Sequence, residues 1–375
     1  AHPDRAAERA LALVHAVLRR SSYLALLDEQ PSALARLIEV MAASAWMAER
    51  LCAHPLLLDE LLDARIDAAP LTGAEVLDAL ARHLEADPEA SDTEAALVAL
   101  NEFRQSQSFR VALATVLRRQ PPTFGARQLA WIAEATVRAA LTRVDAEMRR
   151  QHGVLAPGGG LAVLAYGSFG GEELGFGSDL DLVFLYDAAA APGESDGARP
   201  LDAVRYHARA VQKLIALLAT LTPAGRLYEV DPRLRPDGAK GLLVSSLESF
   251  SAYQRSRAWT WEHQALVRAR FVAGETGVGQ AFDAIRRDAL TRVRDPGDVR
   301  RDVGDMRRRM RVELDRSEVA RFDLKQGEGG LVDLEFLLQA GVLSCASRAP
   351  ELLRHTRTPA LIDALREARW LQPEE

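Results

Sequence analysis

Apolar residues recur every three or four positions through the first part of the chain, which is the spacing of amphipathic helices. Ala, Leu, Arg and Glu dominate this part, and turn-forming residues interrupt it at short intervals. One apolar stripe consists of Ala133, Val137, Leu141, Val144 and Met148. The interruptions fall at Ser21-Ser22, Pro31-Ser32, His54-Pro55, Pro70 to Gly73, Ala86 to Ser91 and Pro121-Pro122. Residues 1 to about 152 are therefore expected to form helices with short connections.

The pattern changes after the turn-rich stretch at residues 156–160, APGGG. Leu161 to Tyr166 and Leu180 to Tyr186 are short apolar runs beside glycine, which favours strands over helices. Residues 188–200 have the composition of a low-complexity loop. Residues 201–220 then have the pattern of a helix.

Strand character returns in residues 226–236, RLYEVDPRLRP, and in residues 241–246, GLLVSS. From about Phe250 onward the chain is predicted to be helical again. A second apolar stripe there consists of Val299, Val303, Met306 and Met310. The predicted fold class is thus α+β and mostly helical, with a small mixed sheet and its helices between helical regions.

At 375 residues the chain is longer than one ordinary compact domain, so two or three units are expected. We predict a helical, linker-like or regulatory region at 1–152 and a mixed α/β core domain at 153–274. A helical bundle at 275–375 is expected to be appended to the core. The chain begins without methionine, which suggests processing or a piece of a longer protein.

The formal net charge of −6 and a pI near 5.9 give no overall attraction to nucleic acid or to an anionic membrane. Only 6% of the residues are aromatic, which also disfavours base stacking on a single strand. Cys52 and Cys345 lie far apart, so neither a disulfide framework nor a zinc site is indicated. The apolar runs are too short to span a bilayer. A reduced, cytoplasmic protein is expected.

The strongest chemical signal is the segment Leu161 to Asp187, in which a glycine-rich turn, GSFGG, separates the two predicted strands. Asp179 and Asp181 are two residues apart, so on a strand they point to the same side. Two carboxylates beside a turn that admits phosphate fit Mg²⁺ ions holding a nucleoside triphosphate. Glycine at positions 167, 170 and 171 allows close backbone approach, and the amides from Glu172 onward are expected to open a helix toward the phosphates. The alternative is a tight turn with solvated strand-end acids.

A later strand carries Asp231. If that strand neighbours the one with Asp179 and Asp181, Asp231 becomes a third carboxylate, able to contact a metal and accept a proton. Arg233 and Arg235 would share a face and could pair with phosphate oxygens. Equally, these arginines could neutralise the acidic cluster or pair with Asp231 as a structural brace.

Three further segments have unusual composition. Residues 259–270, WTWEHQALVRAR, are predicted as one packed helix, in which His263 is a satisfied helix histidine rather than a base. Residues 324–339, LKQGEGGLVDLEFLLQ, indicate either a close approach to the nucleotide domain or a helix start with acids at its positive end. The Arg-rich residues 300–321 are interleaved with acids and are expected to form a solvated helix face, or a docking surface for an acidic partner.

Together these motifs resemble a known family. The pairing of GS with DLD and a later strand Asp is similar to the polymerase β-like nucleotidyltransferase superfamily. Four ordered blocks resemble the carboxy-terminal, adenylylating half of the bifunctional glutamine synthetase adenylyltransferases. They are AYGSFGGEELGFGSDLDLVFLYD, YEVDPRLRPDGAKGLLVSSLESFSAYQ, AWTWEHQALVRARFV and FDLKQGEGGLVDLEF. The resemblance runs from about Gly153 to Gln339. The helices before it look like that family's central regulatory region.

The resemblance implies Asp179, Asp181 and Asp231 as Mg²⁺ ligands, with Asp231 also as the base, and Gly167 and Ser168 at the triphosphate of ATP. It implies transfer of AMP from ATP to a tyrosine hydroxyl of glutamine synthetase. In the full-length enzyme a PII-type signalling protein is the expected regulatory partner. One departure is that the family usually has Gly-Lys-Leu-Gly-Gly where this chain has GSFGG, although the wider superfamily uses serine there.

Four alternative functions are considered at the level of sequence. The chain could be the deadenylylating copy, or another protein nucleotidyltransferase such as a uridylyltransferase. A nucleic-acid nucleotidyltransferase is disfavoured by charge and by low aromatic content. A non-catalytic nucleotide-binding regulatory module is the fourth, against which the intact carboxylates argue.

Overall fold

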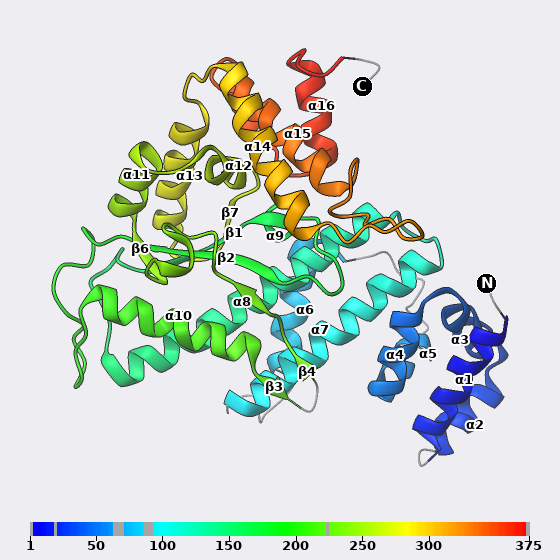
Figure 1. Ribbon diagram of the computed structural model, residues 1–375. Coiled ribbons are helices and arrows are strands. Elements are labelled where there is room, and N and C mark those ends of the chain that lie inside the picture. The colour runs from blue at the N-terminus through cyan, green and yellow to red at the C-terminus, as the bar shows by residue number, and fades with distance from the viewer. Residues whose placement is uncertain (1–2, 19–20, 63–70, 86–92, 223–224, 373–375) are drawn as a thin grey trace. The chain divides into compact units, whose positions relative to one another are not determined.

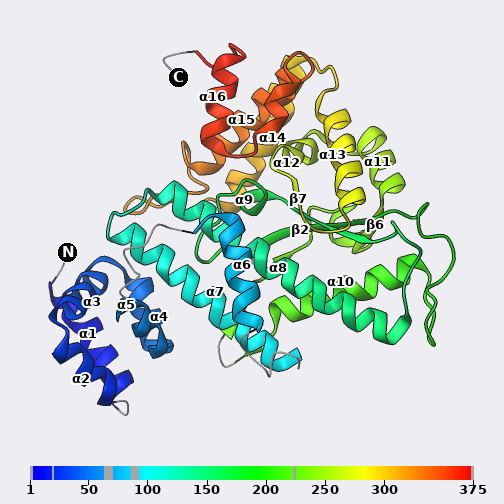
Figure 2. The ribbon, with the colours of Figure 1, turned by 180° about the vertical axis from the view of Figure 1, so that it is seen from behind.

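The computed structural model describes residues 3–18, 21–62, 71–85, 93–222 and 225–372 (Figures 1 and 2). The chain divides into two compact units, one of residues 1–136 and 219–227 and the other of residues 137–218 and 228–375. The division passes through the long helix α8 (Pro122–His152), which contributes residues to both units. The sequence-based boundary at residue 152 lies at the end of that same helix.

The first unit is helical, as its periodicity predicts. Its elements before α8 are α1 (Pro3–Val17), α2 (Ser21–Glu29), α3 (Pro31–Ala43), α4 (Ala45–Ala53), η1 (Pro55–Leu57), α5 (Leu58–Leu62), α6 (Gly73–Glu85) and α7 (Thr93–Val116). Leucine, valine and methionine side chains of α1, α3, α4 and α7 form a common core. The predicted breaks at Pro31, His54 and Pro122 are confirmed. The break at residues 86–91 lies outside the described residues.

A two-stranded hairpin also belongs to the first unit, although it follows much later in sequence. Its strands β3 (Leu221–Thr222) and β4 (Gly225–Arg226) pair antiparallel. The buried Asn101 of α7 donates hydrogen bonds from its side-chain amide to the Gly225 carbonyl at 3.2 Å and the Thr222 hydroxyl at 3.4 Å. The hairpin is thereby fixed to the helices of this unit.

The second unit contains a five-stranded mixed sheet in the order β5-β2-β1-β7, with β6 also paired to β2. β1 (Leu161–Ala165) and β7 (Arg270–Gly274) run antiparallel to each other, and β1 runs antiparallel to β2 (Leu180–Tyr186). Two short strands, β5 (Val230–Asp231) and β6 (Val244–Ser246), pair in parallel with the start and the end of β2. The two central strands β1 and β2 are almost fully buried, which explains their continuous apolar runs.

Helices cover this sheet (Figures 1 and 2). α11 (Leu247–Ser256), α12 (Thr260–Val267), α13 (Thr276–Leu290), α14 (Pro296–Leu314), α15 (Leu331–Cys345) and α16 (Thr358–Glu367) share one apolar core with residues of β1 and β2. α10 (Ala203–Ala219) joins the end of α8 through Lys213 and Glu147, 2.6 Å apart. Short elements α9 (Gly167–Gly170), η4 (Gly238–Lys240) and η5 (Pro350–Arg354) complete the unit. The α+β, mostly helical prediction is confirmed.

Three local predictions are wrong. The region after Phe250 is not wholly helical, because Arg270–Gly274 forms β7. Residues 259–270 are not one helix, since α12 ends at Val267 and Arg268 follows as its cap. Of the predicted strand at 226–236, only Arg226, the end of β4, and the two residues of β5 are in strands, and a turn begins at Arg233. Each error comes from a short strand whose hydrogen-bond partners are remote in sequence.

No helix within the described ranges is long and apolar enough to cross a membrane.

Candidate active site

The glycine-rich turn and the first two carboxylates meet at one end of the sheet because β1 and β2 are antiparallel neighbours. Ala165, the last residue of β1, pairs with Leu182 near the start of β2. The next amide, that of Tyr166, donates to the Asp181 carbonyl at 2.9 Å. The turn that begins at Gly167 therefore lies directly beside Asp181.

Asp231 joins this group through the parallel pairing of β5 with β2. In that register Leu180 lies opposite Val230 and Asp181 lies opposite Asp231. The expectation that the strand of Asp231 neighbours the strand of Asp181 is confirmed. Asp179 lies one residue before β2 and is exposed.

Two features of the structure require glycine at position 167. Its φ of +55° is in the left-handed region that side chains with a Cβ rarely adopt. A Cβ added there would lie 2.2 Å from Oδ2 of Asp181. The backbone of the turn is thus in direct contact with a candidate metal ligand.

We predict that Gly167→Ala lowers the free energy of unfolding by about 1 kcal/mol or more, from backbone strain alone. Nucleotide transfer should fall as well, because the new methyl group must displace the Asp181 carboxylate. Gly177→Ala is the matched control, since a Cβ at Gly177 meets nothing within 4 Å. Melting temperature and transfer rate of the two variants test this, and equal behaviour would contradict it.

Ser168 lies in α9, which begins at Gly167 and not at Glu172 as predicted. The helical hydrogen bonds start with the amide of Gly170, which donates to the Tyr166 carbonyl at 2.7 Å. Glu172 instead adopts a positive φ of 52° in the turn that ends this element. The amides of α9 that precede the first helical bond are therefore those of Gly167, Ser168 and Phe169, and they include both residues of the GS pair.

Asp181 is the carboxylate whose protonation the site perturbs most clearly. Burial, together with the negative charges of Asp179 and Asp231, raises the pKa of Asp181 to about 6, against the opposing charges of Lys325 and Arg233. A group of acids whose charges are incompletely balanced is suited to a cation.

Arg233 balances part of this negative charge, because its guanidinium group donates hydrogen bonds to both oxygens of the Asp231 carboxylate. Its Nε lies 2.9 and 2.8 Å from the two carboxylate oxygens, and Nη2 lies 2.5 Å from Oδ2. The hydrogen bond from Arg233 lowers the pKa of Asp231 despite partial burial. The side chain of Arg233 is itself largely exposed, so this pair can open toward solvent.

Arg235 does not share a face with Arg233, because the two lie in a turn and not in a strand. The buried Arg235 side chain donates to the carbonyls of Pro232 at 2.6 Å, Gly241 at 3.1 Å and Ala239 at 3.2 Å. It fixes the turn that links β5 to β6.

The donor set fits Mg²⁺, which prefers carboxylate oxygens and retains several waters. Within the described part of the chain, no group of three or more Asp, Glu, His or Cys side chains is arranged so that it could hold a metal ion as it stands. Asp231 would first have to exchange Arg233 for the metal.

His263 lies inside the second unit and not at the carboxylates. Burial lowers its pKa to about 4, and its Nε2 lies 3.1 Å from the Gln254 carbonyl. The neighbouring Glu262 accepts from the Tyr253 hydroxyl at 2.7 Å and from the Trp259 amide at 2.9 Å. The prediction of a satisfied helix histidine is confirmed.

The side chain of Arg268, at the end of α12, links the segment that follows the glycine-rich turn to α15. Its guanidinium lies 2.7 Å from Glu173 and 2.5 Å from Glu335 of α15, and its side chain is 4% exposed. Glu173 also accepts from the Thr358 amide and hydroxyl at 2.6 and 2.7 Å. A Cβ at Gly171 would lie 2.1 Å from Nη2 of Arg268, so this glycine makes room for the arginine.

Sequence reasoning missed two residues of the site, Arg268 and Lys325. The sequence places Arg268 only within a predicted helix and Lys325 only within a glycine-rich segment. Glu173, which pairs with Arg268, and Asp181, whose pKa is lowered by the charge of Lys325, lie far away in sequence, so no local pattern could reveal these relations. For Lys325 a signal was present, which is the rarity of lysine in this chain.

Comparison with known proteins identifies the family of the chain. Residues 34–285 match the glutamate-ammonia ligase adenylyltransferase family. A bifunctional glutamine synthetase adenylyltransferase/adenylyl-removing enzyme from Xanthomonas axonopodis pv. citri is 60% identical over 99% of this chain. Proteins of the same name from Stenotrophomonas maltophilia and Nitrosococcus oceani are 57% and 44% identical, each over 100% of the chain.

The chain spans 39% of the length of these relatives. The family match covers well over half of this chain and includes both β2 and β5. By this match the chain belongs to the glutamate-ammonia ligase adenylyltransferase family.

Proposed function

We propose that this chain is a Mg²⁺-dependent adenylyltransferase with a polymerase β-like nucleotidyltransferase core, which moves AMP from ATP to a tyrosine hydroxyl of glutamine synthetase and releases pyrophosphate. The observation that carries the proposal is the register of β5 against β2, which pairs Asp231 with Asp181. The names of the relatives support the protein substrate and the transferred group.

In this proposal Asp179 and Asp181 hold Mg²⁺, which neutralises triphosphate charge when bound. The GS turn orients the phosphates through Gly167 and Ser168. Asp231 would be the third carboxylate to hold the metal, and it accepts the proton of the attacking tyrosine hydroxyl. Arg233, released from Asp231, is then free to pair with a phosphate oxygen. Positioning and charge neutralisation supply most of the rate enhancement.

Glutamine synthetase is the proposed protein partner, and a PII-type signalling protein is the proposed regulatory partner of the longer enzyme. Incubation with labelled ATP, Mg²⁺ and glutamine synthetase, followed by mapping of the modified residue, tests the proposal. Incorporation from UTP in place of ATP would indicate a uridylyltransferase. Nucleotide binding without any incorporation would indicate a regulatory module.

We predict that the chain adenylylates glutamine synthetase but does not efficiently remove AMP, because its sequence contains one GS and DLD motif set. Adenylylated glutamine synthetase and phosphate are the reagents for the test. Rapid release of ADP would assign this chain to the deadenylylating reaction and contradict the prediction.

A further inference from the structure

Lysine is scarce in this chain. Of its 47 basic residues only Lys213, Lys240 and Lys325 are lysines, which leaves 44 arginines (47 − 3). Lys213 is accounted for by its ion pair with Glu147, and Lys240 lies exposed in η4. Lys325 lies in the loop between α14 and α15, which also contains three glycines.

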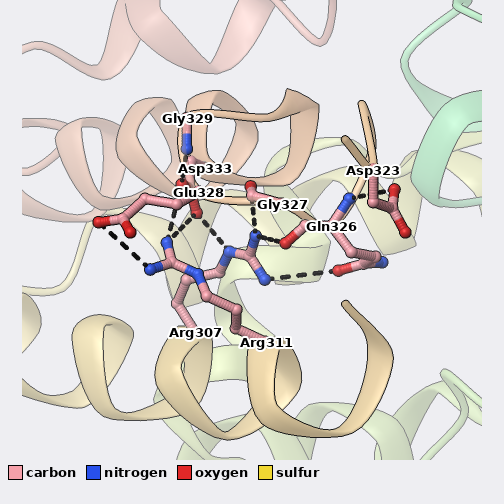
Figure 3. Close-up of polar contacts among 8 residues, drawn as sticks. All are labelled: Arg307, Arg311, Asp323, Gln326, Gly327, Glu328, Gly329 and Asp333. Carbon is pink, nitrogen blue, oxygen red and sulfur yellow. Dashed lines mark hydrogen bonds and ion pairs between the residues drawn. The ribbon is translucent and has the colours of Figure 1, made fainter. Parts of the chain in front are cut away.

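The loop that contains Lys325 is held in place by contacts with the buried Arg307 of α14 (Figure 3). Arg307 of α14 is 6% exposed, although the sequence placed it on a solvated helix face. Its Nη2 donates to the Gln326 carbonyl at 2.6 Å, and its Nε lies 2.5 Å from Asp333. The backbone on either side of Gln326 is therefore fixed to α14.

Asp333 organises the other end of the same loop (Figure 3). It accepts from the Gly329 amide at 2.6 Å and from Arg311 at 2.9 Å. Burial opposes ionisation, but the Gly329 amide, Arg307 and Arg311 lower the pKa of Asp333 overall. The reading of residues 324–339 as a helix start with acids in its first turn is confirmed.

The loop lies against the catalytic end of the sheet. The Val332 amide of α15 donates to the Lys325 carbonyl at 3.1 Å, so Lys325 lies beside the start of this helix. Glu335, one turn further on, reaches the glycine-rich turn through Arg268 and Glu173. The Glu173 amide in turn donates to the Ser168 carbonyl at 2.9 Å, so this network connects the loop of the exposed Lys325 to the GS turn.

We propose that Lys325 binds the β- and γ-phosphates of the nucleotide and stabilises the departing pyrophosphate, and that Arg307 and Asp333 are the positioning residues that hold its loop at the carboxylates. This inference rests on the proposed nucleotidyl transfer. A compact ammonium on a flexible stem suits a triphosphate whose charge moves onto the leaving group during reaction. Such a role also gives a physical reason for lysine in a chain that otherwise uses arginine.

Direct binding of three ligands tests the proposal without relying on turnover. Mg·ATP, Mg·pyrophosphate and AMP are titrated calorimetrically into the wild type, Lys325→Met and Lys325→Arg. We expect Lys325→Met to weaken ATP and pyrophosphate binding by about 10- to 100-fold, the loss of a charge-assisted hydrogen bond, and to leave AMP binding unchanged. Lys325→Arg should restore part of the loss.

Arg321→Met is the matched control, because it removes one exposed cation from the same loop, where Arg321 pairs only loosely with Glu318 at 3.8 Å. It should bind all three ligands like the wild type. Asp333→Asn should reproduce the phosphate-selective loss and add little to Lys325→Met. A general structural effect would weaken AMP binding equally.

Wild-type affinity of Lys325→Met for pyrophosphate would overturn the role of Lys325 and leave the nucleotidyl transfer standing. A wild type that binds neither ATP nor pyrophosphate would overturn both.

Discussion

Asp179→Asn and Asp181→Asn are each expected to abolish nucleotide transfer and to leave the fold intact. Each substitution removes one hard oxygen ligand and one negative charge from the site that faces the triphosphate. We expect a loss of about 10³-fold, the upper end of what removal of a single charge-stabilising group costs. Single-turnover transfer from labelled ATP, with circular dichroism on the same samples, measures both quantities.

The stability of Asp181→Asn gives an independent readout. In the wild type, the folded-state pKa of Asp181 is about 6, above the ordinary 3.8. Between these values the folded protein keeps a proton that the unfolded chain has lost, so the free energy of unfolding decreases as pH rises from about 4 to about 6.

At neutral pH and without divalent metal the whole penalty is present, and Asp181→Asn should unfold with about 1–3 kcal/mol more free energy than the wild type. The difference should shrink below pH 4. An Asn variant that unfolds more easily at pH 7, or that transfers nucleotide at a near-normal rate, would contradict the assignment of Asp181.

Asp231→Asn is expected to lose turnover by a few orders of magnitude, with ~10²–10⁴ attributable to proton transfer alone. Mg·ATP binding should survive better than turnover, because Asp179 and Asp181 still hold the cation. The geometry sharpens this prediction, since Arg233 forks onto Asp231. Asn keeps the acceptor oxygen for one of these hydrogen bonds but cannot accept a proton.

If Asp231 has only a structural role, the opposite result is expected. If its only role is to brace the turn with Arg233, Asp231→Asn and Arg233→Ala should lower the melting temperature by similar amounts, with normal activity in the folded fraction. The expected loss from such an exposed pair is small. Melting temperature, nucleotide affinity and single-turnover rate of both variants therefore show whether Asp231 acts as a general base or only stabilises the turn through Arg233.

The strands and carboxylates of the catalytic end could be predicted because their signals are local. The two-residue period of a strand singles out Asp179 and Asp181 as a pair, although Asp179 lies one residue before β2, and the break at GSFGG follows from glycine. The neighbourhood of Asp231 could be stated only as a condition, because the pairing of β5 with β2 depends on residues about 50 positions apart.

Other parts of the site could not be read from local patterns. Arg233 and Arg235 have the spacing of a strand, but Arg235 turns away because the carbonyls of its own turn offer it three acceptors. Arg307 looks like one more charge on a solvated helix, but it donates to the Gln326 carbonyl and pairs with Asp333, 19 and 26 residues later. Backbone acceptors within its own turn decide the case of Arg235, and partners remote in sequence decide the case of Arg307.

The course of the backbone between α10 and β5 bears on the position of Asp231. After Leu218 the backbone enters the helical unit for residues 219–227 and then returns, so that Asp231 follows Leu227 by four positions. The side-chain amide of Asn101 in α7 holds this segment by donating a hydrogen bond to the Gly225 carbonyl. The hairpin segment and the third carboxylate are therefore joined by only a few residues of backbone, so that insertions or deletions between Leu227 and Asp231 should be tolerated far less well than in an ordinary surface loop.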